Sequence, residues 1–159
     1  MKKILSAVLA VAAASVAFAQ DTATQTVTYS VSAVNSITVI GTPTLALTDL
    51  NAAGTAFEED TDTATYSLFT NSAGMKITAS LDSDMPTGFT LALEMAAPAG
   101  TESAGSTELS AAPADLVTDI SNVDATDLVM TYTLNADATA DAAESGTRTV
   151  TFTITDGSI

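Results

Sequence analysis

The sequence contains no cysteine, histidine or tryptophan, and positive charge is scarce, with four Lys and Arg against 19 Asp and Glu. Without Cys and His there is no thiol nucleophile, no Ser-His-Asp triad and no usual ligand set for zinc, iron–sulfur clusters or haem. The net charge of -15 excludes nucleic acid as a partner, because phosphate binding depends on Lys and Arg. We therefore predict that the chain is not an enzyme and that it has no cofactor other than, at most, calcium.

The N-terminal residues have the features of a secretory signal peptide. Lys2 and Lys3 form a short positive region, Ile4–Val16 is an apolar run, and the next three residues, Ala-Phe-Ala, fit the small-x-small cleavage pattern. The apolar run is too short for a transmembrane anchor, and no second run of spanning length follows. We predict a signal peptide at 1–19 and an exported domain at 20–159 that has no membrane span and is extracellular, at the cell surface or periplasmic.

Alternation of apolar residues with Thr or Ser is the dominant pattern in the rest of the chain. Successive side chains of a strand point to opposite faces, so this pattern predicts strands with one face in the core and the other in solvent. The predicted strands are Val27–Ala33, Ala64–Leu68, Met75–Leu81, Phe89–Met95, Leu128–Leu134 and Val150–Ile154, with shorter candidates at Ser36–Ile40 and Thr44–Thr48.

Turn-forming and acidic segments separate these runs. Asn71–Gly74 is typical of a hairpin connection, and Asp49–Asp62, Pro98–Ser106 and Asp137–Gly146 are typical of exposed loops. The chain has no strong helical pattern, and its length suits one core. The predicted fold is therefore a single all-β domain, an antiparallel β-sandwich of immunoglobulin-like type with about seven to eight strands.

Acidic residues cluster in the predicted loops. Calcium takes roughly six to eight oxygen ligands, largely from carboxylates and carbonyls, so such clusters are candidate calcium sites. The alternative is a set of solvated acidic loops, since the run Asn135–Asp141 lacks the glycine and the terminal Glu of an EF-hand loop. The candidate calcium ligands are Glu58, Asp60, Asp62, Asp137, Asp141 and Glu144.

The two ends of the exported domain favour assembly. Thr24–Ile40 is a long alternating stretch, and the last predicted strand, Val150–Ile154, ends close to the C-terminus. Terminal strands with open edges pair with strands of other subunits. We predict a secreted structural or surface-assembly protein, such as a pilus or filament subunit or a component of a surface layer. Its partners would be copies of itself or other cell-surface proteins, joined by strand addition.

A second interpretation stays open. The chain could be a secreted binding module whose acidic loops hold calcium or recognise a carbohydrate or a protein. Both interpretations place the protein outside the cytoplasm, and neither assigns a catalytic residue.

Several stretches give the chain a resemblance to small secreted bacterial surface proteins. They are Gln25–Val31 followed by Ile37–Val39, and later Lys76–Asp82 and Arg148–Asp156. More loosely, the layout is similar to spore coat protein U-like proteins and archaic chaperone–usher pilus subunits. That resemblance implies immunoglobulin-like domains joined by donated strands. The chain departs from those subunits in having no disulfide, which they commonly carry, and in having a complete final strand, which they lack.

Overall fold

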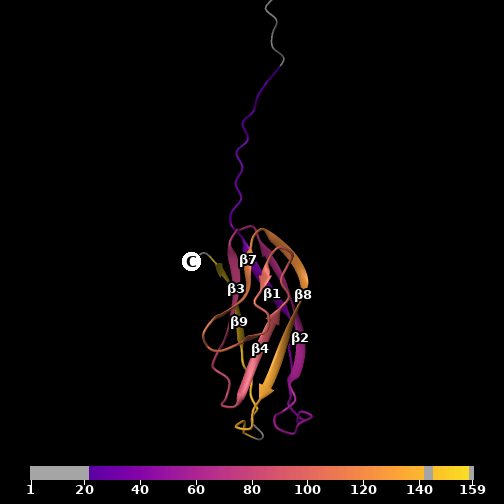
Figure 1. Cartoon of the computed structure of the whole chain (residues 1–159). Coiled ribbons are helices and arrows are strands. Elements are labelled where there is room, and N and C mark those ends of the chain that lie inside the picture. The colour runs from indigo at the N-terminus through magenta and orange to yellow at the C-terminus, as the bar shows by residue number, and fades with distance from the viewer. Residues whose placement is uncertain (1–21, 142–144, 158–159) are drawn as a thin grey trace, which may run out of the picture. The chain divides into compact units, whose positions relative to one another are not determined.

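The structure is a computed structural model that describes residues 22–141 and 145–157. The predicted signal peptide, 1–19, lies outside the described residues. The chain divides into two compact units, 1–31 and 32–159. Residues 22–31 of the first unit contain no helix or strand, and all strands of the described residues belong to the second unit (Figure 1). No helix long and apolar enough to cross a membrane occurs in the part of the chain that the structure describes.

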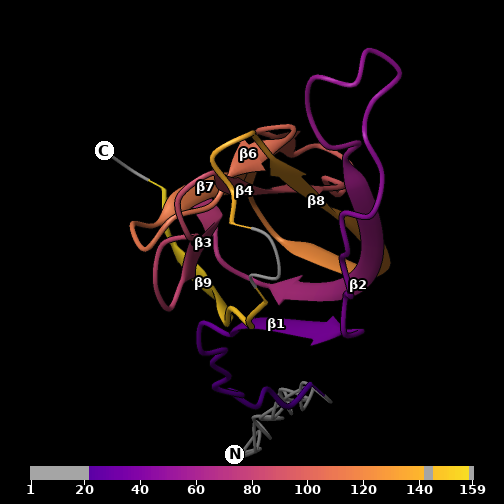
Figure 2. The same ribbon diagram turned by 90° about the horizontal axis from the view of Figure 1, so that it is seen from below.

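Two antiparallel sheets form the second unit, and they face each other as a β-sandwich (Figures 1 and 2). The five-stranded sheet has the order β1-β2-β8-β4-β6, and the four-stranded sheet has the order β5-β7-β3-β9. The strands are β1 Asn35–Ile40, β2 Asp60–Thr70, β3 Met75–Leu81, β4 Phe89–Met95, β5 Glu102–Ser103, β6 Thr107–Glu108, β7 Ala114–Ile120, β8 Val123–Ala136 and β9 Val150–Asp156.

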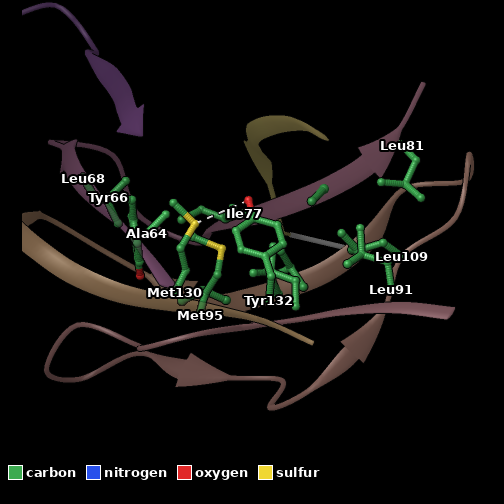
Figure 3. Packing of buried hydrophobic residues seen from close by; sticks show 14 of the residues in the cluster. Ala64, Tyr66, Leu68, Ile77, Leu81, Leu91, Met95, Leu109, Met130 and Tyr132 are labelled. Carbon is green, nitrogen blue, oxygen red and sulfur yellow. Dashed lines mark hydrogen bonds between the residues drawn. The ribbon is translucent and has the colours of Figure 1, made fainter. Parts of the chain in front are cut away.

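The core lies between the sheets and follows from the alternation in the sequence. Ile77 of β3 is fully buried and faces β4 and β8 of the other sheet, which contribute Met95, Met130 and Tyr132 (Figure 3). The Tyr132 hydroxyl donates a hydrogen bond to Met130 Sδ at 3.8 Å. The buried Tyr66 donates its hydroxyl proton to the Ala96 carbonyl at 2.5 Å, and burial raises the pKa of Tyr66 to about 12. Buried polar groups thus keep hydrogen-bond partners.

The predicted all-β sandwich is confirmed, with nine strands in the described residues rather than seven or eight. The additional strands are the two-residue β5 and β6 and the longer β7, which the alternation did not reveal. In β7, the adjacent Leu116 and Val117 are both buried, and Asp119 has a positive φ of 58°. The pairing of β7 with β3 is irregular at this point, and such bulges interrupt the period of two.

The prediction of a hairpin at Asn71–Gly74 is wrong. This segment joins β2 to β3, which lie in different sheets. It is held from the start of β8 instead, because Asn122 N–H donates to the Ser72 carbonyl at 3.0 Å and the Ser121 hydroxyl accepts from Gly74 N–H at 3.0 Å. The turn residues were recognised correctly, but they cross from one sheet to the other.

The prediction of a strand at Val27–Ala33 is also wrong, because the first strand begins at Asn35. The side chains of Val27, Tyr29 and Val31 are 75%, 90% and 83% exposed. An alternating run shows that a segment suits a half-buried strand, but a strand forms only where another strand supplies the hydrogen bonds. Within the described residues, Val27–Val31 belongs to neither sheet.

Candidate functional site

The first acidic cluster fastens the segment that follows β1. The Asp60 carboxylate accepts a hydrogen bond from Ala46 N–H, and the Asp62 carboxylate accepts one from Thr44 N–H, both at 2.7 Å. Thr44–Thr48 is therefore not the predicted strand of a backbone ladder. It runs beside the start of β2 and is bonded through aspartate side chains. Glu58, the third candidate of this cluster, is exposed just before β2.

The third acidic cluster forms a turn after β8. Asp137 Oδ1 accepts from the Thr139 hydroxyl at 2.6 Å and from Thr139 N–H at 2.7 Å. These two hydrogen bonds, the side-chain one first, lower the pKa of Asp137. Asp141 is exposed at the edge of a pocket described below, and Glu144 lies outside the described residues.

Other aspartates also accept backbone hydrogen bonds. Asp82 Oδ1 accepts from Thr149 N–H at 3.1 Å, and Asp84 Oδ1 accepts from Ala111 N–H at 2.7 Å. Across residues 22–141 and 145–157, no group of three or more acidic side chains is placed to hold a metal ion. Calcium binding by the six candidate residues stays a prediction, while the geometry shows that several aspartates fasten loops to strands.

The hydrogen bonds of Asp62 predict a pH-dependent contribution to stability. Thr44 N–H and, secondly, Thr63 N–H lower the pKa of Asp62 from 3.8, so the folded state binds a proton less readily than the unfolded state. The contribution is fully present above about pH 4 and is lost as the pH falls through the lowered pKa. We expect Asp62→Asn to lower the melting temperature at neutral pH, and we expect this difference to shrink toward about pH 2, measured by circular dichroism.

Glu59→Gln is the matched control for that measurement, since Glu59 is an exposed neighbour and its replacement also removes one negative charge. We expect it to leave the melting temperature at neutral pH nearly unchanged. A difference between Asp62→Asn and wild type that stayed constant down to about pH 2 would contradict the assignment.

Charge is distributed very unevenly along the chain. Residues 22–48 contain no Asp, Glu, Lys or Arg, although the chain has 23 such residues in all. This uncharged run includes the whole of β1, which is an edge strand. The other edge strand on the same side of the sandwich, β9, carries a single charge, at its last residue Asp156 (Figure 2). Natural proteins usually protect exposed edges with charged side chains, Lys above all.

The core is incompletely covered along this side. Several apolar side chains here pack against the core but remain partly exposed. They are Ile37 of β1, Leu45, and Val150, Phe152 and Ile154 of β9. On the opposite side, Leu109, which follows the short edge strand β6, and Val117 of β7 are 2% and 0% exposed. The β1 and β9 side is therefore a margin at which apolar core surface reaches solvent.

A pocket of about 540 Å³ opens at one end of this margin. It lies between the segment that follows β1 and the segment that precedes β9, and its wall includes Leu45, Leu47, Phe89, Leu134 and Arg148. The Arg148 guanidinium donates through Nε to the Asp84 carbonyl at 3.1 Å and through Nη1 to the Thr147 carbonyl at 3.0 Å. The pocket is mostly apolar, which suits an apolar side chain better than an ion.

The chain just before β1 is fastened to the end of β2. Asn71 Oδ1 accepts from Val34 N–H at 2.7 Å, Asn71 Nδ2 donates to the Ser32 carbonyl at 2.8 Å, and Asn71 N–H donates to the Val34 carbonyl at 3.2 Å. The backbone groups of Ser32 and Val34 that bond to Asn71 point to the same side of the chain, as the backbone groups of alternate residues in an extended chain do. Residues 32–34 therefore continue the line of β1 beyond the end of β2.

The fold places this protein in the class of two-sheet antiparallel β-sandwiches, and one side of the sandwich has open edge strands that carry little charge. Comparison of the chain with protein-family models, with curated proteins and with solved structures finds no match.

Sequence reasoning identified the alternating N-terminal stretch and the open terminal strands, but it missed that both edges lie on one side and carry little charge. The gap between Asp21 and Asp49 is visible in the sequence and is a signal that could have found this surface.

Proposed function

We propose that this protein is a secreted structural protein that assembles into a surface layer or filament by strand addition at the sheet edges β1 and β9, which carry little charge. The observation that carries the proposal is the uncharged run 22–48, which combines exposed alternating apolar side chains with the edge strand β1. An unprotected edge is a template for pairing with another chain. Repulsion between acidic subunits opposes association, and it is weakest where the contacting surface carries no charge.

The absence of Cys and His supports a structural role. Assembly requires only backbone hydrogen bonds and apolar contacts, which the edges supply, and no reactive side chain. The partners are copies of this chain or other surface proteins with open edges. Recovery of the protein outside the cytoplasm with Gln20 as its first residue would support export through the predicted signal peptide. A start at Met1 would contradict that cleavage.

A charge placed within the exposed apolar run tests the proposal. We expect the wild-type protein to form oligomers or filaments at high concentration, and we expect Tyr29→Glu to abolish them. A glutamate in place of Tyr29 puts a charge on the apolar face of Val27–Val31, where strand addition would desolvate it. Analytical ultracentrifugation and negative-stain microscopy at moderate salt would measure the assembly of the wild-type protein and of the variant.

Thr28→Glu is the matched control, because it adds the same charge one residue away, on the polar face of the run. We expect this variant to assemble nearly as well as wild type. A wild-type protein that stays monomeric at high concentration would refute the proposal, and so would equal loss of assembly in both variants. Heat released on calcium titration of such a monomer would favour the alternative, a secreted binding module.

A further inference from the structure

We propose that the strand acceptor is the free edge of β9, and that the donor is residues 25–33 of a second copy of this chain. This inference rests on the proposed function, and it names the two surfaces through which copies meet. Four observations carry it: the burial of β9, the direction of its free backbone groups, the match between the two segments, and the fastening of residues 32–34.

The acceptor strand is much less buried than its neighbour in the sheet. None of the seven residues of β9 is fully buried, whereas five of the seven residues of its neighbour β3 are. The inward side chains of β9 are Val150, Phe152 and Ile154, which pack against the core on one side and remain partly exposed. A further strand beside β9 would cover them in the way that β9 covers β3.

The same three residues present free backbone groups. Just before β9, the Thr149 carbonyl accepts from Asp82 N–H at 3.0 Å, and just after it Gly157 N–H donates to the Gly74 carbonyl at 2.7 Å. Both contacts are on the side of β3. Because hydrogen-bonding groups alternate along an antiparallel strand, those of Val150, Phe152 and Ile154 are directed to the free edge.

The donor segment matches β9 residue by residue. Three apolar side chains of 25–33, those of Val27, Tyr29 and Val31, have the spacing of the three inward side chains of β9. The intervening Thr28 and Ser30 would lie beside the outward Thr residues of β9. Pairs of aromatic with β-branched residues, and of Thr with Ser, stabilise neighbouring strands. The donor carries no charge, so it can approach an acidic molecule without repulsion.

The edge of β1 fits the donor less well. Ile37 and Val39 lie on one face of β1, where Val39 is 38% exposed, and Asn35, on the same face, accepts a hydrogen bond from the Thr70 hydroxyl at 2.5 Å. A donated strand on β1 would therefore face two apolar side chains and a polar one. The edge of β9 offers three apolar side chains in succession.

The fastening of residues 32–34 favours a second copy as donor. The hydrogen bonds with Asn71 hold Ser32 and Val34 in the line of β1. To lie on β9 of its own chain, the segment before Ser32 would have to leave the line of β1 directly before these bonds. Donation to another copy requires no such turn.

Cysteine cross-linking tests the inference, since the natural chain contains no cysteine. The experiment mixes two single-cysteine variants of the full chain: Ser30→Cys, and either Thr151→Cys or Thr153→Cys. The mixture is mildly oxidised at a concentration at which the protein associates. Neighbouring strands bring side chains of the same face within disulfide distance. We expect a mixed dimer joined through Ser30→Cys and β9 as the main product, identified by mass spectrometry of the linked peptides. The control mixture pairs Ser30→Cys with Thr38→Cys, on the outward face of β1, and should give little mixed dimer.

Each of the other outcomes contradicts a different part of the proposal. Preferential joining to Thr38→Cys would overturn β9 as the acceptor and leave the proposed function in place. A double variant, Ser30→Cys with Thr153→Cys, that closes a disulfide within one chain at low concentration would overturn the second copy as donor. Equal, random joining in both mixtures of an associating protein would refute strand donation by residues 25–33. Failure of the wild-type protein to associate would instead remove the proposed function itself.

Discussion

Replacing Ile77 by alanine is expected to lower the free energy of unfolding by about 2–5 kcal/mol. Ile77 is fully buried in β3, between β7 and β9, and it faces the five-stranded sheet across the core (Figure 3). The loss combines the hydrophobic free energy of the missing atoms with the cost of the cavity they leave, because close-packed strands relax only in part. Urea unfolding of the monomer followed by circular dichroism measures the change.

Ile40→Ala is the matched control, because the same atoms are removed from a side chain that is 61% exposed. We expect it to change the free energy of unfolding by less than about 1 kcal/mol, as surface substitutions usually do. Comparable losses at Ile77 and Ile40 would show that the two sheets do not enclose the core described here.

Replacing Gly88 by alanine is expected to lower the free energy of unfolding by at least about 3 kcal/mol. Gly88 has a φ of +86°, which costs an L residue roughly 1–2 kcal/mol. An alanine Cβ would also lie 2.8 Å from the Ala140 Cα and the Thr139 carbonyl carbon, and it would overlap the Ala140 backbone nitrogen. The loop after β8 packs directly on this glycine, and Asp137 N–H donates to its carbonyl at 2.9 Å.

Gly100→Ala separates the two causes. Gly100 has a similar φ of +83°, but nothing lies within 4 Å of where its Cβ would be. We therefore expect Gly100→Ala to cost only the backbone share, roughly 1–2 kcal/mol, in the same thermal or urea unfolding measurement. Equal effects at both glycines would argue against the close approach of the Thr139–Ala140 backbone.

Much of the sandwich could be predicted from local alternation. Met75–Leu81 and Phe89–Met95 form strands at the bounds that their apolar residues indicated, because burial on one face of a sheet imposes a period of two. The same signal could not show which strands would pair. Asn71–Gly74 has the residues of a hairpin turn, yet it connects different sheets, since the choice of partner depends on the whole chain.

The candidate surface was predictable only in part. The exposed face of Val27–Val31 has the pattern of a strand, and nothing local distinguishes a segment that pairs within the chain from one that does not. The acidic residues have a structural role that their spacing did not indicate. Asp60 and Asp62 have the spacing of paired ligands, but the structure directs their carboxylates to the backbone of Thr44 and Ala46. A carboxylate satisfies a free backbone N–H as readily as it binds a cation.

The separation of charge along the chain has a kinetic consequence for the proposed assembly. Repulsion between the acidic bodies of two copies acts over a distance of about one Debye length, roughly 10 Å at 0.1 M salt, whereas strand pairing acts only on contact. Low ionic strength should therefore slow the encounter of copies much more than it weakens a pair already formed. The proposed filaments or layers would then grow slowly at low ionic strength and rapidly at high ionic strength.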